Sequence, residues 1–251
     1  MSISTAVNSA TAPSPRPRTA VVVGGTSGMG RAVAELLLSR GERVIVTTRS
    51  PEGDAARELA ANGVSVVCAD ITKEDGLDEV VAAVDASNVD HLVLSAAQLQ
   101  YKPFREFSAE EASLTVVGKM MGYWRVVHRL APLLADDASV VLFSGVAAAR
   151  PGPGTAAVTA ANAGIEGLGR SLAVELAPIR VNVLNPGIFD TPSWDGMPEA
   201  ERRAFFSATA KSLPAGRVGE PADAADAVAF LLDNPHVTGT TLTLDGGGLL
   251  V

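Results

Sequence analysis

The sequence has little cysteine, few histidines and no long apolar run among its 251 residues. Its single cysteine, Cys68, excludes an internal disulfide and indicates a reducing compartment, and we expect this residue to be buried in a strand. A membrane partner is not expected, because no apolar run reaches the roughly 20 residues that cross a bilayer. The three histidines, His91, His128 and His236, lie far apart without the spacing of metal ligands, so no metal site is predicted.

Basic residues are also scarce relative to acidic ones, with 20 Lys and Arg against 28 Asp and Glu. Binding to nucleic acid requires clustered positive charge, so no nucleic-acid partner is expected. Residues 1–18 lack the apolar core of a secretion signal, and we interpret them as a disordered tail. Arg16 and Arg18 leave a transit peptide as the weaker alternative. Residues 19–251 are predicted to form one domain in the cytoplasm.

Short β-branched runs alternate with longer amphipathic stretches, which predicts an alternation of strands and helices. The expected strands cover residues 20–23, 43–47, 64–69, 91–95, 139–144, 180–185 and 240–244. The expected helices cover residues 28–39, 52–61, 74–84, 109–134, 156–176 and 221–232. We therefore predict an α/β fold, a doubly wound Rossmann-type parallel sheet of seven strands with helices on both faces. Residues 186–219 fit a substrate lid better than a linker between domains.

The turn between the first expected strand and the first expected helix has the composition of a loop that grips a pyrophosphate. Glycine lets the backbone turn tightly and approach phosphate oxygens, and the N–H groups of a helix N-terminus attract negative charge. The predicted contacts come from Gly24, Thr26, Ser27, Gly28, Met29 and Gly30. An ordinary strand-to-helix turn is the weaker alternative, because the glycines directly follow a β-branched run. We therefore predict a dinucleotide-binding catalytic domain across residues 19–251.

The end of the second expected strand distinguishes the two nicotinamide dinucleotides. No carboxylate stands there to receive a ribose 2′-hydroxyl, and Arg49 occupies the place instead. A guanidinium suits a ribose 2′-phosphate. We therefore favour NADP(H) over NAD(H) as the cofactor, with a solvated surface arginine as the alternative interpretation of Arg49.

Three further segments resemble the short-chain dehydrogenase/reductase family, so that the resemblance spans about residues 19–251. They are residues 171–182 (SLAVELAPIRVN), 185–191 (NPGIFDT) and 237–247 (VTGTTLTLDGG). The resemblance implies hydride transfer between a nicotinamide and a small-molecule carbonyl or alcohol, by a homodimer or homotetramer. It also implies cofactor contacts at Asp70, Ile71, Ser95, Ala96, Ala97, Asn162, Pro186, Gly187, Ile188 and Thr191. Asp70 could instead cap the turn that follows it.

The proton-transfer residues of this family are missing. Its members carry Tyr-x-x-x-Lys on the fifth expected helix, where this chain has Val158 and Asn162. The family's serine aligns with Gly145, next to Ser144, and its supporting asparagine aligns with Lys119. Because no Tyr, Lys or His occurs between positions 145 and 175, this loss does not depend on the details of the alignment.

Lys119 and Ser144 are the candidate replacements for the missing catalytic groups. A partly desolvated lysine could donate a proton or stabilise negative charge, and Ser144 could reach a substrate after a small shift. The alternatives are a solvated helix lysine and a strand-end serine. Asn162 is interpreted as a retained ribose contact without a catalytic role. Substrate contacts are predicted at Gln98, Tyr101, Arg150 and Trp194.

Three functions are open to a chain with an intact cofactor loop and changed catalytic positions. The first is an atypical NADP(H)-dependent reductase of a small imine or activated carbonyl, which needs no tyrosine acid. Lys119 and residues 95–97, 144–145 and 151–154 resemble tyrosine-lacking members from secondary metabolism, some of which couple imine reduction to ring formation. The second is a redox-neutral cyclase or isomerase that uses bound NADP(H) structurally. The third is a non-catalytic protein that senses NADP(H).

Overall fold

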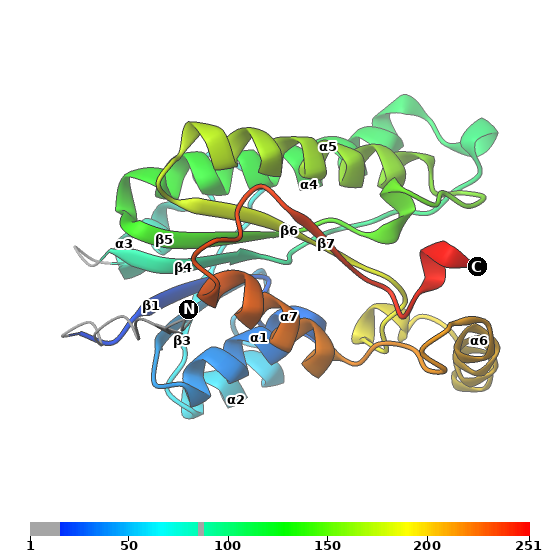
Figure 1. Cartoon of the computed structure of the whole chain (residues 1–251), viewed down its shortest axis with the longest axis horizontal. Helices are drawn as coiled ribbons and strands as arrows, with labels where there is room; N and C mark the ends of the chain where they lie inside the picture. The colour runs from blue at the N-terminus through cyan, green and yellow to red at the C-terminus, as the bar shows by residue number, and fades with distance from the viewer. Residues whose placement is uncertain (1–15, 85–87) are drawn as a thin grey trace, which may run out of the picture.

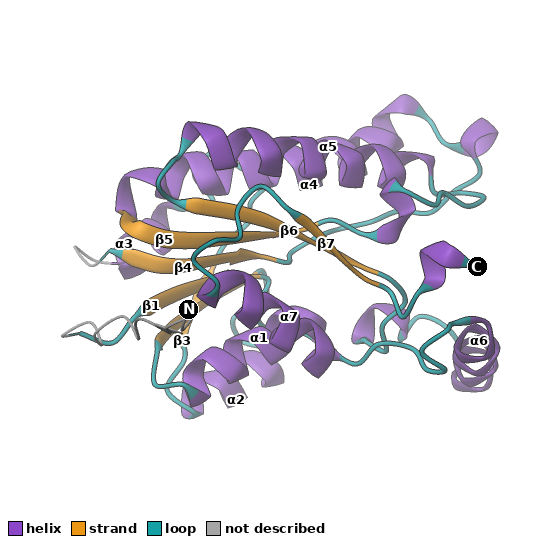
Figure 2. Ribbon diagram, viewed as in Figure 1, coloured by secondary structure: helices purple, strands orange, loops and turns teal. Residues whose placement is uncertain are grey.

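The computed structural model describes residues 16–84 and 88–251 and contains a seven-stranded sheet, drawn in orange in Figure 2. Neighbouring strands pair in parallel in the order β3-β2-β1-β4-β5-β6-β7. The strand bounds are β1 Thr19–Val23, β2 Arg43–Thr48, β3 Ser65–Cys68, β4 Val89–Leu94, β5 Leu134–Phe143, β6 Arg180–Pro186 and β7 Thr241–Leu244. The arrangement confirms the predicted Rossmann-type α/β fold.

Helices cover both faces of the sheet (Figure 1). One face carries α1 (Gly28–Ser39), α2 (Asp54–Ala61) and α7 (Pro221–Asp233). The opposite face carries α3 (Asp78–Val84), α4 (Ala109–Leu130) and α5 (Ala156–Glu175). Helix α6 (Glu199–Ser212) lies away from both layers, beyond the carboxyl ends of the strands. Four short 3-10 helices occur near the same end, η1 (Phe104–Glu106), η3 (Val146–Ala148), η4 (Pro192–Trp194) and η5 (Gly248–Leu250).

The central strands are apolar because helices cover both of their faces. Every residue of β1 and β4 is buried. Successive side chains of a strand point to opposite faces, so Leu92 packs in the cluster under α4 and α5 and Val93 in the cluster under α1 and α7. The strands are held between these two clusters, and the loops of the candidate site follow the ends of the strands.

The strand order changes direction between β1 and β4, and ligands of such sheets bind outside the carboxyl ends at this point. The glycine loop follows β1, and residues 95–103 follow β4. Ser144 directly follows β5, and Pro186 ends β6. The topology therefore brings the predicted cofactor and catalytic segments to one edge of the sheet.

Two local predictions are wrong. Cys68 lies in a strand but is exposed, because β3 is an edge strand with only β2 beside it. Helix α4 ends at Leu130 rather than at residue 134, and a 3-10 turn containing Pro132 leads directly into β5. Proline lacks the N–H that an α-helix would need at that point. The predicted tail of residues 1–18 falls almost wholly on residues 1–15, which lie outside the described part of the chain.

The predicted lid region, residues 186–219, contains η4 and α6. Trp194 of η4 packs on two aromatic residues of α6, with ring centroids 4.9 Å from Phe205 and 6.0 Å from Phe206. Its indole Nε1 also donates to the Phe189 carbonyl oxygen at 2.9 Å. These contacts tie α6 to the chain that leaves β6. Within residues 16–84 and 88–251, no helix has the length and apolar character needed to cross a membrane.

Candidate active site

The glycine loop packs so closely on the end of β4 that side chains would not fit. A Cβ atom at Gly24 would lie 2.8 Å from the Cα of Ala96, and Gly24 has a φ of +81° that favours glycine. A Cβ atom at Gly30 would overlap the Ser95 hydroxyl and the Gly24 carbonyl oxygen. The Ser95 Oγ donates to the carbonyl oxygens of Val23 at 3.0 Å and Gly24 at 3.3 Å, so Ser95 braces the loop from the neighbouring strand.

The N-terminus of α1 is left open by its own side chains. Ser27 is the N-cap residue, but its hydroxyl caps no backbone N–H, and the first turn holds no acidic residue. Thr191, after β6, lies across from Gly28, with 3.4 Å between its Cβ and a Cβ built at the glycine. Uncapped N–H groups and a backbone free of Cβ atoms fit the phosphates of a dinucleotide. Of the other predicted contacts, Thr26 lies in the loop before α1 and Met29 is the second residue of α1.

Arg49 lies just past the end of β2, with an exposed guanidinium. Its Nη1 donates to Gln98 Oε1 at 3.0 Å, and no described carboxylate forms an ion pair with it. Gln98, predicted to contact substrate, therefore lies beside Arg49. A guanidinium without an acidic partner at this position fits a ribose 2′-phosphate.

The loop after β3 uses Asp70 to hold its own turn. Asp70 Oδ1 accepts from the Thr72 backbone N–H at 3.0 Å and from the Thr72 hydroxyl at 2.6 Å. These hydrogen bonds lower the pKa of the Asp70 carboxyl. The capping alternative therefore describes the structure, and Asp70 Oδ2 forms an ion pair with Lys73 Nζ at 3.8 Å. Ile71 packs on Gly122 of α4, where a Cβ atom would come within 2.7 Å of it.

Lys119 of α4 is buried, with 3% of its surface exposed, which excludes the solvated-lysine alternative. Its Nζ donates to Asn162 Oδ1 at 2.7 Å and to the Ser144 carbonyl oxygen at 3.1 Å. Burial lowers the pKa of the Lys119 amine to about 7. In the resembled family the asparagine lies on the helix that corresponds to α4 and the lysine on the one that corresponds to α5. Here the two residue types are exchanged, with Lys119 on α4 and Asn162 on α5.

The Ser144 hydroxyl is directed toward α5. Ser144 Oγ donates to Glu166 Oε1 at 3.0 Å and contacts the Asn162 carbonyl oxygen at 3.2 Å. Glu166 lies four residues after Asn162 on α5, which places both residues on one helical face. This spacing is the sequence signal that points to Glu166, a residue that was not among the predicted site residues. The structure thus joins Lys119, Asn162, Ser144 and Glu166 in one polar network.

The positions of the family's tyrosine and serine supply no protic side chain. Val158 is buried on α5, with 2% of its surface exposed. A Cβ atom at Gly145 would lie 2.8 Å from Asn162 Nδ2, so a serine would require Asn162 to move. Asn162 Nδ2 instead donates to the Gly145 carbonyl oxygen at 3.3 Å. The amide of Asn162 thus occupies the space into which a serine side chain would project.

A hollow of about 350 Å³ lies between the loops after β5 and β6, α6 and the C-terminal segment. Gly187 and Ile188 line it on one side and Arg150 on the other. The Arg150 guanidinium donates to the Gly248 carbonyl oxygen. Asp245 also faces this hollow, but its two carboxylate oxygens accept the backbone N–H groups of residues 247 and 249. Arg150, which the sequence predicts as a substrate contact, is thus among the residues that line this hollow.

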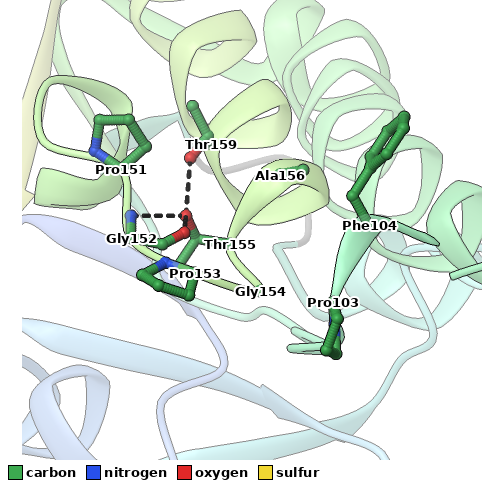
Figure 3. Close-up of a pocket in the computed structure, with 9 residues that line it drawn as sticks. All are labelled: Pro103, Phe104, Pro151, Gly152, Pro153, Gly154, Thr155, Ala156 and Thr159. Atoms are coloured by element: carbon green, nitrogen blue, oxygen red, sulfur yellow. Dashed lines mark hydrogen bonds between the residues drawn. The ribbon is translucent and has the colours of Figure 1, made fainter. Parts of the chain in front are cut away.

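A second hollow, of about 430 Å³, lies between Pro103 and Phe104 on one side and residues 151–156 on the other (Figure 3). Tyr101, just before it in the chain, has 65% of its surface exposed. Ala97 is likewise exposed, whereas Pro186 is buried at the end of β6. Among the described residues, no group of three or more His, Cys, Asp or Glu side chains could hold a metal ion.

The chain is similar to many known proteins, both in sequence and in structure. A family model described as "Enoyl-(Acyl carrier protein) reductase" matches residues 23–248. "Carbonyl reductase family member 4" of Danio rerio is 32% identical over 241 residues, which cover 92% of this chain and 97% of the relative. A solved structure of a small-chain dehydrogenase in complex with NADPH has a TM-score of 0.81 and 30% identity, covering 94% of this chain and all of the other.

A third relative comes from Malbranchea aurantiaca. The "Short-chain dehydrogenase/reductase malC" is 31% identical over 252 residues, which cover 94% of this chain and 96% of the relative. A solved structure described as MalC Reductase/Diels-Alderase has a TM-score of 0.86 and 29% identity, covering 94% of this chain and 98% of that one. The chain belongs to the short-chain dehydrogenase/reductase family.

Proposed function

We propose that this protein is an NADP(H)-dependent reductase that acts on a small organic substrate, an imine or an activated carbonyl compound, in secondary metabolism. One observation carries the proposal. The cofactor cradle is intact, whereas Val158 and Gly145 offer no proton donor where the family carries tyrosine and serine. A substrate that is already electrophilic, such as an iminium ion, needs hydride and no acid at those positions.

The shape and charge of the cradle support NADP(H) as the cofactor. The loop that contains Gly24, Gly28 and Gly30 would hold the pyrophosphate against the uncapped start of α1. Arg49 would hold the ribose 2′-phosphate, and the NADPH complex of a related structure supports this assignment. When bound, NADP(H) supplies or accepts a hydride.

The residues of the chain then position the substrate and exclude water. Val158 carries no polar atom on its side chain, so this position offers a protonated imine no competing hydrogen-bond donor. Asn162 and Lys119 hold the end of β5 against α5 through the hydrogen bonds described above. Lys119 is the one amine near this point in the described chain, and we propose that it supplies a proton to ketones less efficiently than a tyrosine would.

A redox-neutral cyclase or isomerase is the second candidate. The relative described as MalC Reductase/Diels-Alderase favours it, because that description joins a reductase with a ring-forming activity. In this case the bound dinucleotide and Val158 would form a wall that orders the substrate. A non-catalytic NADP(H) sensor is the third candidate, and a hollow of about 350 Å³ beside Gly187 and Ile188 counts against it.

A binding and turnover experiment separates these candidates. The protein is titrated with NADPH while nicotinamide fluorescence is recorded, and panels of imines and ketones are then added while nicotinamide absorbance is followed. The reductase predicts binding and oxidation of NADPH with imines in preference to ketones. Product formation without oxidation would instead support the cyclase, and binding without any product would support the sensor.

The cofactor assignment has its own test in Arg49→Ala. Loss of a charge-assisted contact is expected to weaken NADPH binding about tenfold or more while NADH binding changes little. Arg57→Ala, which removes an exposed arginine of α2, is the matched control. Equal effects of Arg49→Ala on both dinucleotides would remove the assignment to NADP(H).

The proposed assembly is a homodimer or homotetramer in the cytoplasm. Helix α4 leaves Leu114, Val117 and Trp124 exposed, with 58%, 46% and 53% of their surfaces accessible. Large apolar side chains along one exposed helix support a subunit contact. Size-exclusion chromatography with light scattering measures the assembly, and a monomeric mass would overturn this part of the proposal.

A further inference from the structure

The hollow drawn in Figure 3 lies next to the candidate active site but is separate from the hollow beside Gly187 and Ile188. Its walls come from the loops after β4 and β5, which both end at the cofactor edge of the sheet. The Lys102 backbone N–H donates to the Gly154 carbonyl oxygen at 3.0 Å and joins the two loops. Ala156 and Thr159 of α5 also line the hollow, on either side of Val158 in the sequence.

The two threonine hydroxyls of this hollow are already paired with backbone carbonyl oxygens. Thr155 Oγ1 accepts the Gly152 backbone N–H at 3.0 Å and donates to the Gly152 carbonyl oxygen at 2.8 Å (Figure 3). Thr159 Oγ1 donates to the Ala147 carbonyl oxygen at 2.9 Å. None of the described lining residues is charged. Its threonine hydroxyls are thus already paired, and the proline, phenylalanine and alanine side chains of the lining offer shape and apolar surface to a ligand.

The apolar walls are stiff and partly open to water. Pro103, Pro151 and Pro153 fix the backbone around the hollow, which lowers the entropy lost when a ligand is bound. Phe104 has 78% of its surface exposed, so a ligand that covered this ring would remove apolar area from water. The volume of about 430 Å³ falls within the range of small-molecule sites.

We infer that this hollow binds an apolar, ring-bearing part of the substrate while the reacting group lies beside Val158. The inference rests on the proposed reductase function and extends it to a substrate class, cyclic imines that are fused to an aromatic ring or carry one. Phe104 provides a face for ring stacking, and residues 151–156 provide the opposite wall.

Gly152→Leu tests the inference by filling the hollow. A Cβ atom at Gly152 meets only Thr155 Cγ2, at 3.9 Å, so the backbone accepts a side chain there. Gly154 is unsuitable because its φ is +77°. Gly196→Leu is the matched control, since an added Cβ at that loop position has no atom within 4 Å and Gly196 does not line the hollow.

Two imines that differ by a fused benzene ring provide the activity readout. Gly152→Leu is expected to lower kcat/KM for dihydroisoquinoline about tenfold or more and to leave the value for piperideine, the same six-membered imine without the benzene ring, within about twofold. Gly196→Leu is expected to change neither value. An equal loss for both imines, or no loss for either, would overturn the inference while leaving imine reduction itself established.

Direct binding of indole provides a readout that does not depend on turnover. Saturation-transfer NMR with NADPH present is expected to show indole bound to the wild type and to Gly196→Leu but not to Gly152→Leu. If this pattern holds and neither imine is reduced, the proposed function fails and the apolar site survives. If Gly152→Leu instead changes the oligomeric mass and leaves indole binding intact, a second copy of the chain occupies the hollow and the inference is wrong.

Discussion

Replacing Lys119 with methionine is predicted to remove a pH-dependent part of the folding free energy. The amine is enclosed by α4, α5 and the end of β5, with Asn162 Oδ1 and the Ser144 carbonyl oxygen as acceptors. Tyr123 lies one turn along α4, and Glu166 reaches the network through the Ser144 hydroxyl. Burial lowers the pKa of Lys119 from the ordinary 10.5 to about 7. The unfolded chain would keep the ordinary value.

The sign of the effect follows from where the proton resides. Between about pH 7 and pH 10.5 the unfolded chain holds a proton on Lys119 that the folded chain has released. The unfolding free energy therefore rises with pH across this window. The stabilisation from Lys119 is fully present above the pKa of the unfolded chain, 10.5, and is lost below the pKa of the folded chain, about 7. At about 1.4 kcal/mol per pH unit, this group adds about 2 kcal/mol to the unfolding free energy between about pH 7 and about pH 9.

Urea unfolding at several pH values measures this slope. Lys119→Met is expected to have a lower unfolding free energy than the wild type at high pH, because Asn162 Oδ1 loses its hydrogen-bond donor. Its unfolding free energy is also expected to lack the rise with pH that Lys119 contributes. Lys211→Met, at an exposed position of α6, is the control that keeps the wild-type slope. Equal slopes for the wild type and Lys119→Met would refute the reasoning, whatever the offset between their stabilities.

Two further sets of variants test the cofactor cradle and the exchanged lysine and asparagine. Gly30→Ala is expected to weaken NADPH binding at least about tenfold in a fluorescence titration, because the added methyl overlaps Ser95 Oγ. The control is Gly167→Ala on α5, where an added Cβ meets no atom within 4 Å, and this variant is expected to bind NADPH as the wild type does. Val158→Tyr with Asn162→Lys restores the family's residues but places a second amine beside Lys119. Adding Lys119→Asn is expected to raise kcat/KM for ketones about tenfold or more over that double variant. Equal kcat/KM values would show that Lys119 does not interfere.

Much of the fold could be predicted because its signals are periodic and local. Alternating β-branched and amphipathic segments gave the parallel sheet, and glycines in the first turn gave the cofactor cradle. The contact between Lys119 and Asn162 could also be predicted, because the family resemblance places both positions at one site. The exchange of lysine and asparagine between helices can be recognised once the two positions are compared together.

Other features depend on side-chain directions that spacing does not determine. Ser144 turns its hydroxyl toward Glu166 on α5, and the neighbouring Gly145 backbone packs closely on the Asn162 amide. Gln98 bonds Arg49, although both lie in loops that are far apart in the sequence. The exposure of Cys68 follows from β3 being an edge strand, which requires the complete strand order.

Hydride transfer to an activated substrate without a tyrosine proton donor is the central claim. Its direct measurement is a single-turnover reaction with NADPH that carries deuterium at the transferable position, with pyrroline or cyclohexanone as substrate and mass spectrometry of the product. The account predicts oxidation of NADPH, one deuterium on the former imine carbon and much slower reduction of cyclohexanone. Reduction of cyclohexanone as fast as that of pyrroline, or bound NADPH that reduces neither compound, would contradict it.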